Sequence, residues 1–121
     1  MKILVTGGTG YIGSHTVVEL LNSKHEVLIV DNLSNSYESV LDQIVSITKK
    51  RPVFEKIDLA DEKKTRDFFQ RHDDIVGIVH FAAYKAVGES VQEPLKYYQN
   101  NLISLMNILQ NMQDHGIKHL V

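Results

Sequence analysis

Apolar and polar positions alternate along the chain in blocks of two kinds. Short, mainly apolar runs at residues 3–5, 27–30, 53–57 and 75–81 are typical of strands buried in a parallel sheet. Between them, apolar side chains recur every three or four residues, which predicts helices over residues 12–23, from residue 40 to about 50, over about ten residues after 61, and from 94 to about 115. This order predicts right-handed βαβ crossovers and one α/β domain, a Rossmann-type doubly wound parallel sheet over residues 1–121.

Four residues indicate where these helices begin and end. The backbone before a proline is pushed out of the α region, so Pro52 is expected to close the second helix. Asp61 is a suitable N-cap for the third, and Pro94 suits the first position of the last. Gly116 is expected to end that last helix.

The last helix contains more apolar residues than one face requires. The residues with alternating spacings of three and four predict the face that packs on the sheet: Leu95, Tyr98, Leu102, Leu105, Leu109 and Met112. Ile103, Met106 and Ile108 lie off that face, which leaves room for a helix-to-helix dimer contact. Residues 118–121 read as the start of a fifth strand, so we expect the fold to be truncated there.

Composition excludes several classes of function. Thirteen basic and fifteen acidic residues give a net charge of −2, which indicates neither nucleic acid nor an anionic membrane as a partner. There is no cysteine to form a disulfide or a thiolate site. The apolar start stops at Thr6, too early for a signal peptide, and no run reaches the roughly 18 apolar residues of a membrane helix, so a cytoplasmic location is expected. His115 and His119 have the spacing of helical metal ligands, but Gly116 separates them, and we expect no metal site.

A glycine-rich turn links the first strand to the first helix. Gly7 suits a tight turn, Gly10 lets backbone approach a pyrophosphate, and Gly13 lets the helix lie close to the strand. The helix would then direct free N–H groups and its positive dipole end at the phosphates. The spacing Gly-x-x-Gly-x-x-Gly is one residue longer than the common dinucleotide fingerprint, and a plain turn between strand and helix is the alternative.

The second apolar run ends in Asp31, eighteen residues after Gly13. Dinucleotide-binding units place at this point the acid that accepts hydrogen bonds from the adenosine ribose. No basic residue follows in residues 32–34, so a 2'-phosphate would meet an unpaired carboxylate, which favours NAD over NADP. The alternative is an ordinary turn acid. In a doubly wound sheet, the loops at residues 7–13, 31–36, 58–59 and 81–85 would converge on one crevice.

The pattern Thr-Gly-x-x-Gly-x-x-Gly at residues 6–13 resembles that of the extended short-chain dehydrogenase/reductases. Three further stretches are similar to the UDP-glucose 4-epimerase branch of this family: Asp-Asn-Leu-Ser-Asn-Ser at 31–36, His-Phe-Ala-Ala-Tyr-Lys-Ala-Val-Gly-Glu-Ser at 80–90, and Pro-Leu-Lys-Tyr-Tyr-Gln-Asn-Asn at 94–101. The resemblance covers residues 1–121 but not a whole enzyme. It implies that the chain is the N-terminal part of such an enzyme.

The resemblance also implies a set of NAD-binding residues. Tyr11 and Ile12 would lie beside the pyrophosphate, Asp31 at the adenosine ribose, and Asp58 with Leu59 beside the adenine. The implied set is Gly7, Gly10, Tyr11, Ile12, Gly13, Asp31, Asn32, Leu33, Ser34, Asn35, Ser36, Asp58, Leu59, Phe81, Ala82, Ala83, Lys85 and Asn100. Three of these have plainer interpretations, because Asp58 suits a turn, Lys85 a solvated loop and Asn100 a polar helix face. Asn101 competes with Asn100 for the same role.

The family's chemistry depends on a Tyr-x-x-x-Lys pair, in which the tyrosine takes the proton from the sugar's 4'-hydroxyl. None of the five tyrosines has a lysine four positions on, so we assign no catalytic residue here and expect the pair beyond Val121. The resemblance implies a UDP-sugar substrate and a homodimer for the parent enzyme, and inactivity for this chain alone. A dehydratase or decarboxylase acting on nucleotide sugars, and a non-catalytic NAD-binding module, remain alternatives.

Overall fold

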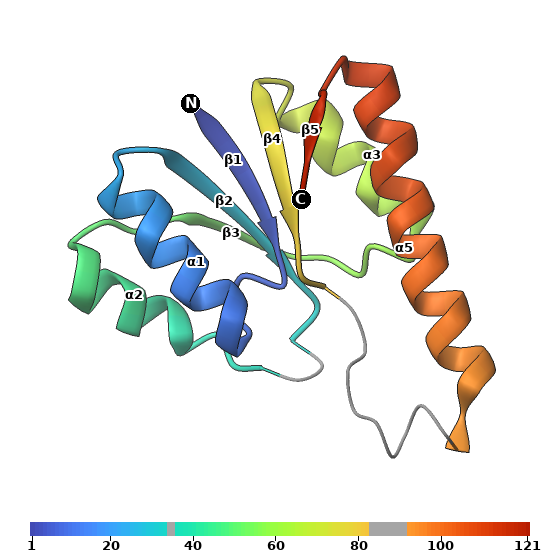
Figure 1. Cartoon of the computed structure of the whole chain (residues 1–121), viewed down its shortest axis with the longest axis horizontal. Coiled ribbons are helices and arrows are strands. Elements are labelled where there is room, and N and C mark those ends of the chain that lie inside the picture. The colour runs from blue at the N-terminus through green and yellow to red at the C-terminus, as the bar shows by residue number, and fades with distance from the viewer. Residues whose placement is uncertain (34–35, 83–91) are drawn as a thin grey trace.

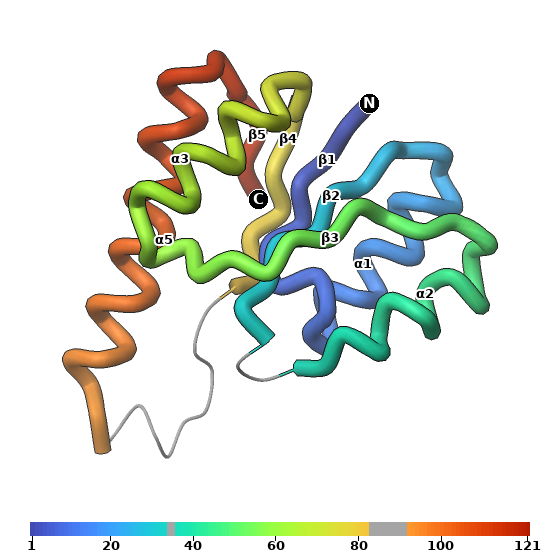
Figure 2. The backbone as a smooth tube through the Cα atoms, turned by 180° about the vertical axis from the view of Figure 1, so that it is seen from behind, coloured from blue at the N-terminus to red at the C-terminus, as the bar shows by residue number. Residues whose placement is uncertain are grey.

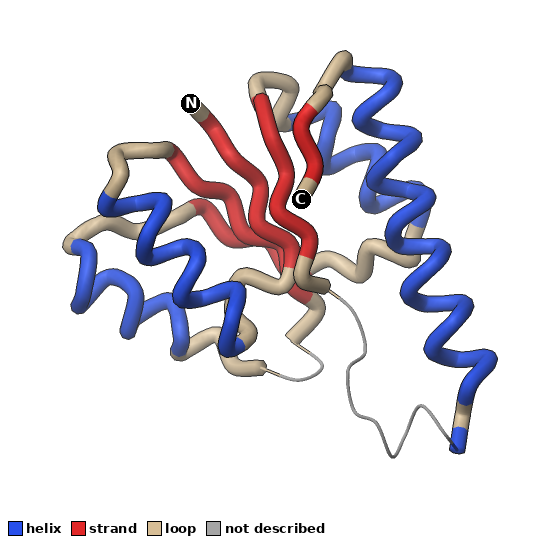
Figure 3. The backbone as a smooth tube through the Cα atoms, in the orientation of Figure 1, coloured by secondary structure: helices blue, strands red, loops and turns tan. Residues whose placement is uncertain are grey.

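The computed structural model describes residues 1–33, 36–82 and 92–121. Strands and helices alternate along these residues, as the apolar pattern predicts (Figures 1 and 3). The elements are β1 (Lys2–Thr6), α1 (Tyr11–Asn22), β2 (Glu26–Asp31), α2 (Val40–Thr48), β3 (Val53–Lys56), α3 (Glu62–Arg71), β4 (Ile75–His80), α5 (Pro94–His115) and β5 (His119–Leu120). No helix within the described residues is both long and apolar enough to span a membrane.

The strands form one parallel sheet in the order β3-β2-β1-β4-β5. Leu4 of the central strand lies opposite Leu28 of β2 on one side and Ile78 of β4 on the other. The chain moves outward from β1 to β3 and then returns past β1 to β4, so strand order reverses between β1 and β4. The predicted doubly wound sheet is confirmed, including the start of a fifth strand at β5.

Helices cover both faces of the sheet, α1 and α2 on one and α3 and α5 on the other (Figures 1 and 2). Successive side chains of a strand point to opposite faces, so adjacent apolar residues pack in two different hydrophobic cores, one on each face of the sheet. Leu4 packs with Phe68 and Ile108 on the α3 and α5 side. Val5 packs with Val17 and Ile44 on the α1 and α2 side. This two-sided burial explains why the strands are apolar runs rather than alternating ones.

Most of the predicted helix ends are confirmed. The Asp61 side chain accepts a hydrogen bond from Lys64 N at 3.0 Å, Pro94 is the first residue of α5, and Gly116 ends α5 in the left-handed region at φ 68°. The end of α2 differs from the prediction that Pro52 closes this helix. That helix stops at Thr48 because Lys49 adopts a left-handed conformation at φ 61°, three residues before Pro52.

The predicted buried face of α5 is wrong in part. The side chains of Leu95, Tyr98, Leu102 and Leu109 are exposed, and Ile108, which we placed off that face, is fully buried. The helix instead buries Tyr97, Ser104, Ile108, Asn111 and Met112. The buried face includes two polar residues, Ser104 and Asn111, so counting apolar residues alone selects the wrong face. Asn107 Nδ2 also donates to the carbonyl of Leu59 at 2.8 Å.

Candidate cofactor-binding site

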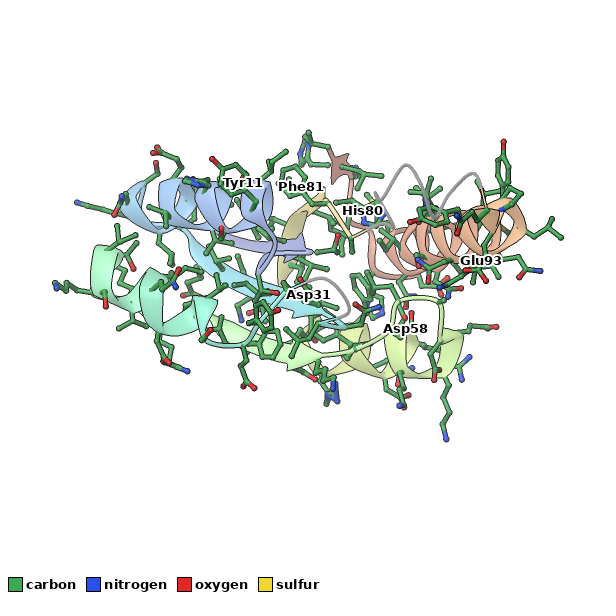
Figure 4. All side chains as sticks on the ribbon, turned by 90° about the horizontal axis from the view of Figure 1, so that it is seen from below. Tyr11, Asp31, Asp58, His80, Phe81 and Glu93 are labelled. Atoms are coloured by element: carbon green, nitrogen blue, oxygen red, sulfur yellow. The ribbon has the colours of Figure 1, made fainter. Side chains whose placement is uncertain are left out.

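The carboxyl edge of the sheet brings the ends of β1 and β4 together at the reversal of strand order (Figure 4). Thr6 Oγ1 accepts hydrogen bonds from the backbone N–H groups of Phe81 at 3.1 Å and Ala82 at 3.2 Å. The same hydroxyl lies 2.6 Å from His80 Nδ1. These bonds hold the chain after β4 against the end of β1. Ligands of doubly wound sheets bind at such a point.

Three glycines build the turn after β1, each for a different reason. Gly7 has φ +70°, and a Cβ there would lie 2.9 Å from the backbone of Phe81 and Ala82. A Cβ on Gly13 would lie 2.1 Å from the carbonyl oxygen of Gly7, so only glycine lets α1 begin this close to the strand. Among the described residues, a Cβ on Gly10 would meet Gly7 O alone, at 3.3 Å, so this part of the structure leaves space for a ligand.

The first turn of α1 begins directly after this open glycine. Gly10 is the N-cap, its N–H donates to Gly7 O at 3.0 Å, and its carbonyl accepts from Ser14 N at 2.9 Å. The N–H groups of Tyr11, Ile12 and Gly13 have no partner within the helix, as at every helix start. The side chains of Tyr11 (Figure 4) and Ile12 are exposed, so both predicted residues lie at the surface.

Asp31, the last residue of β2, lies beside the glycine turn and is 8% exposed. Its Oδ2 accepts from the Thr9 hydroxyl at 2.6 Å, and its Oδ1 accepts from Leu33 N at 2.8 Å. Leu33 has a left-handed backbone at φ 61°. The Ser36 hydroxyl lies 2.7 Å from Thr9 Oγ1. Leu33 thus contacts Asp31 directly, and Ser36 reaches it through Thr9.

The loop after β3 lies next to the same edge, since Ile57 N donates to Asp31 O at 3.2 Å. Asp58 is exposed and its Oδ1 accepts from Ala60 N at 3.0 Å, so the carboxylate also shapes its own turn. Leu59 is 4% exposed and its side chain packs in the core with Phe68. A contact between Leu59 and a ligand would therefore involve its backbone.

The remaining predicted residues follow β4 or lie on α5. Phe81 and Ala82 are half-buried at the carboxyl edge. Asn100 lies near the start of α5, and its Nδ2 donates to Asn101 Oδ1 at 3.4 Å, so the choice between these two amides stays open. Four predicted residues fall outside the described residues: Ser34, Asn35, Ala83 and Lys85.

Sequence reasoning overlooked three residues of this site. Thr9 and Thr6 are buried and bond to groups on other loops, and a Cβ on Gly8 would lie 2.7 Å from the Ile29 side chain. A hydroxyl inside a glycine turn, followed by an acid at the end of the next strand, is the signal that points to Thr9. The contacts of Thr6 and Gly8 depend on neighbouring strands and have no local signal.

The N–H groups at the start of α1 and the carboxylate of Asp31 together could bind a ligand. Helix N–H groups suit an anion, and a carboxylate fixed nearby suits hydroxyl donors. Both lie at the carboxyl edge of the sheet, next to the switch point. A ligand that contains phosphate and a sugar diol fits this combination.

Comparisons with known proteins agree with this geometry. Residues 3–121 match the model of a family described as the NAD dependent epimerase/dehydratase family. The chain is 49% identical over 121 residues to a UDP-glucose 4-epimerase of Bacillus subtilis, which covers 100% of this chain and 35% of that protein. The chain thus spans about a third of the length of such curated relatives.

Solved structures show the same likeness. A UDP-glucose-4-epimerase from Stenotrophomonas maltophila, with bound NAD and formylated UDP-arabinopyranose, superposes with a TM-score of 0.93 at 46% identity, over 99% of this chain and 35% of that one. A UDP-glucose 4-epimerase from Bifidobacterium longum, in complex with NAD+ and UDP, gives a TM-score of 0.94 at 41% identity, over 99% of this chain and 36% of that one.

Proposed function

This chain belongs to the NAD dependent epimerase/dehydratase family, and we propose that it is the NAD-binding part of a UDP-glucose 4-epimerase. The observation that carries the proposal is the switch point between β1 and β4, where an open glycine cradle and a fixed carboxylate share one edge of the sheet. Relatives that are 49% and 46% identical carry this enzyme's name, and the latter was solved with NAD bound.

The residues at this edge fit NAD. The space next to Gly10, which a larger side chain would fill, suits the pyrophosphate, and the N–H groups at the start of α1 would hold it. Asp31 would accept hydrogen bonds from the hydroxyls of the adenosine ribose. Phe81 and Ala82, held against Gly7, would line the path toward the nicotinamide. The absence of a basic residue in residues 32–34 favours NAD over NADP.

In the proposed reaction, UDP-galactose and UDP-glucose interconvert through a 4-keto sugar. The bound nicotinamide supplies a reversible acceptor for the hydride of C4'. The residues of this chain bind and orient the cofactor, and we assign the proton transfer to none of them. We place the enzyme in the cytoplasm, with a UDP-sugar as its small-molecule partner.

We also propose that the full-length protein is a homodimer joined through α5. Several large apolar side chains of this helix face away from the sheet and are exposed: Leu95, Tyr98, Leu102, Ile103, Met106 and Leu109. An apolar stripe of this length on one helix is typical of a surface that another protein covers. A second copy of the same stripe would form an isologous contact.

The cofactor assignment is tested with Asp31→Ala in the full-length protein. We expect NAD binding to weaken by about 1.5 to 3 kcal/mol, the range for a hydrogen bond to a charged group. Isothermal titration calorimetry measures the change. Asp42→Ala is the matched control, because Asp42 is an exposed carboxylate that pairs with Arg51 on α2's side of the sheet. An unchanged dissociation constant for Asp31→Ala would remove this residue from the site.

The reaction is tested by following UDP-galactose with the purified full-length protein. Formation of UDP-glucose without net consumption of NAD supports the epimerase. A product that has lost water would instead identify a dehydratase, and cofactor binding without any turnover would identify a binding module.

A further inference from the structure

We propose that Thr9 is a positioning residue that orients Asp31 toward the adenosine ribose. This inference rests on the proposed NAD-binding function and deepens it. Thr9 occupies a position between Gly7 and Gly10 that the glycine pattern leaves open to any residue. In the structure, however, its side chain is buried against Asp31.

The side chain of Thr9 points inward, not toward the ligand. Thr9 is 2% exposed, and its hydroxyl lies 2.6 Å from Asp31 Oδ2. Its backbone N–H also points at the same oxygen, at 3.4 Å. The hydroxyl and the backbone N–H of Thr9 therefore both donate to a carboxylate 22 positions later in the chain.

The direction of these hydrogen bonds follows from counting protons. A carboxylate oxygen only accepts, so the single hydroxyl proton of Thr9 goes to Asp31. The 2.7 Å contact between Thr9 Oγ1 and Ser36 Oγ must then use the proton of Ser36. The result is a relay from Ser36 to Thr9 to Asp31, which joins the loop after β2 to the glycine turn.

The relay fixes the plane of the carboxylate from both sides. Thr9 holds Oδ2, and Leu33 N holds Oδ1 at 2.8 Å. Thr9 supplies two donors to Oδ2, whereas Leu33 N is one donor to Oδ1, so the second lone pair of Oδ1 can accept from a ribose hydroxyl. A binding group held in one orientation by its neighbours loses less entropy when the ligand binds. Without the Thr9 hydroxyl, a nearly buried carboxylate would lose its shortest hydrogen bond and its fixed orientation.

The test uses the full-length protein and two probes, NAD and its analogue that lacks the adenosine 2'-hydroxyl. Thr9→Val keeps the shape of the side chain but removes the hydroxyl. We expect it to weaken NAD binding about ten-fold and to reduce the preference for NAD over the 2'-deoxy analogue. Thr9→Ser retains a hydroxyl and should restore both. In an Asp31→Ala background, Thr9→Val should have no further effect.

Thr16→Val is the matched control, because the Thr16 hydroxyl donates to Ile12 O within α1, at 3.1 Å, and should leave both affinities unchanged. Thermal melts show whether each variant is folded. The proposal is overturned if Thr9→Val lowers the affinities for NAD and for the 2'-deoxy analogue equally, or if it has the same effect in the Asp31→Ala background. In either case Thr9 would only stabilise the glycine turn. If Thr9→Val binds NAD with unchanged affinity while Asp31→Ala binds it more weakly, the positioning role of Thr9 is overturned but the ribose assignment of Asp31 stands. A normal Asp31→Ala overturns the ribose assignment as well.

Discussion

At the scale of single residues, the three glycines of the cradle have separate causes. Gly7 supplies a positive φ, Gly13 allows close contact between helix and strand, and Gly10 leaves space open. A single motif therefore mixes requirements of folding with requirements of binding. Substitutions at Gly13 and Gly10 should separate the two.

Gly13→Ala tests the requirement of folding. Its Cβ would lie 2.1 Å from Gly7 O, and backbone cannot move aside as a flexible side chain can. We expect the free energy of unfolding to fall by about 1 to 3 kcal/mol, the usual cost of overpacking, as measured by urea denaturation. Gly77→Ala is the control, because its Cβ would meet His119 at an ordinary 3.6 Å. Equal stability of the two variants would contradict the close contact.

Gly10→Val tests the requirement of binding. Its side chain would occupy the place that we assign to the pyrophosphate, and within the described residues the added Cβ would be near Gly7 O alone, at 3.3 Å. We expect a folded protein that no longer binds NAD, shown by a preserved thermal melt and a flat calorimetric titration. A folded Gly10→Val protein that retains NAD would rule out this cradle.

At the scale of elements, α5 shows that apolar spacing alone can select the wrong face of a helix. Ile108 is fully buried and Leu109 is exposed, although spacing alone favours the opposite. The bond from Asn107 to the Leu59 carbonyl ties the helix to the loop after β3. The opposite face of α5 presents an apolar stripe to its surroundings.

The stripe leads to a prediction about assembly. Leu102→Glu places a charge on the exposed face of α5, and we expect it to convert a dimer of the full-length protein into folded monomers, because burying an unpaired charge is costly. Light scattering coupled to size-exclusion chromatography measures the mass. Gln43→Glu adds the same charge at an exposed position of α2, on the other face of the sheet, and should leave the mass unchanged. A Leu102→Glu dimer would exclude this face as the interface.

At the scale of the whole molecule, an ion pair joins the start of β1 to the loop before β4. Lys2 Nζ lies 2.7 Å from Asp74 Oδ2. The hydrogen bond from Lys2 is the main cause that lowers the pKa of Asp74, and the same bond raises the pKa of Lys2. The stabilisation is therefore present above the unfolded pKa of an aspartate, about 3.9, and is lost as the pH falls through the lower folded pKa. At the alkaline end it is lost as the pH rises through the raised pKa of Lys2.

Asp74→Asn should therefore lower the melting temperature slightly at neutral pH and not at all in strong acid, where the wild-type carboxyl is protonated too. The effect should shrink with added salt, because the pair lies at the surface. Differential scanning fluorimetry across pH measures it. Asp73→Asn removes a neighbouring charge but leaves the hydrogen bond in place, and should change the melting temperature less. A decrease for Asp74→Asn that persists unchanged in acid would contradict the ion pair.

The sequence by itself determined the order of the elements, most of their ends, the glycine cradle and the acid at the end of β2. These follow from local causes: apolar runs, the cap at Asp61, the ring of Pro94 and the backbone freedom of Gly116. Only the tertiary structure decided which face of α5 is buried and which side chain holds Asp31. Those outcomes involve Asn107 and Thr9, whose partners lie 48 and 22 positions away along the chain. A hydrogen bond between distant residues exists only once the sheet has brought them together, so no local pattern encodes it.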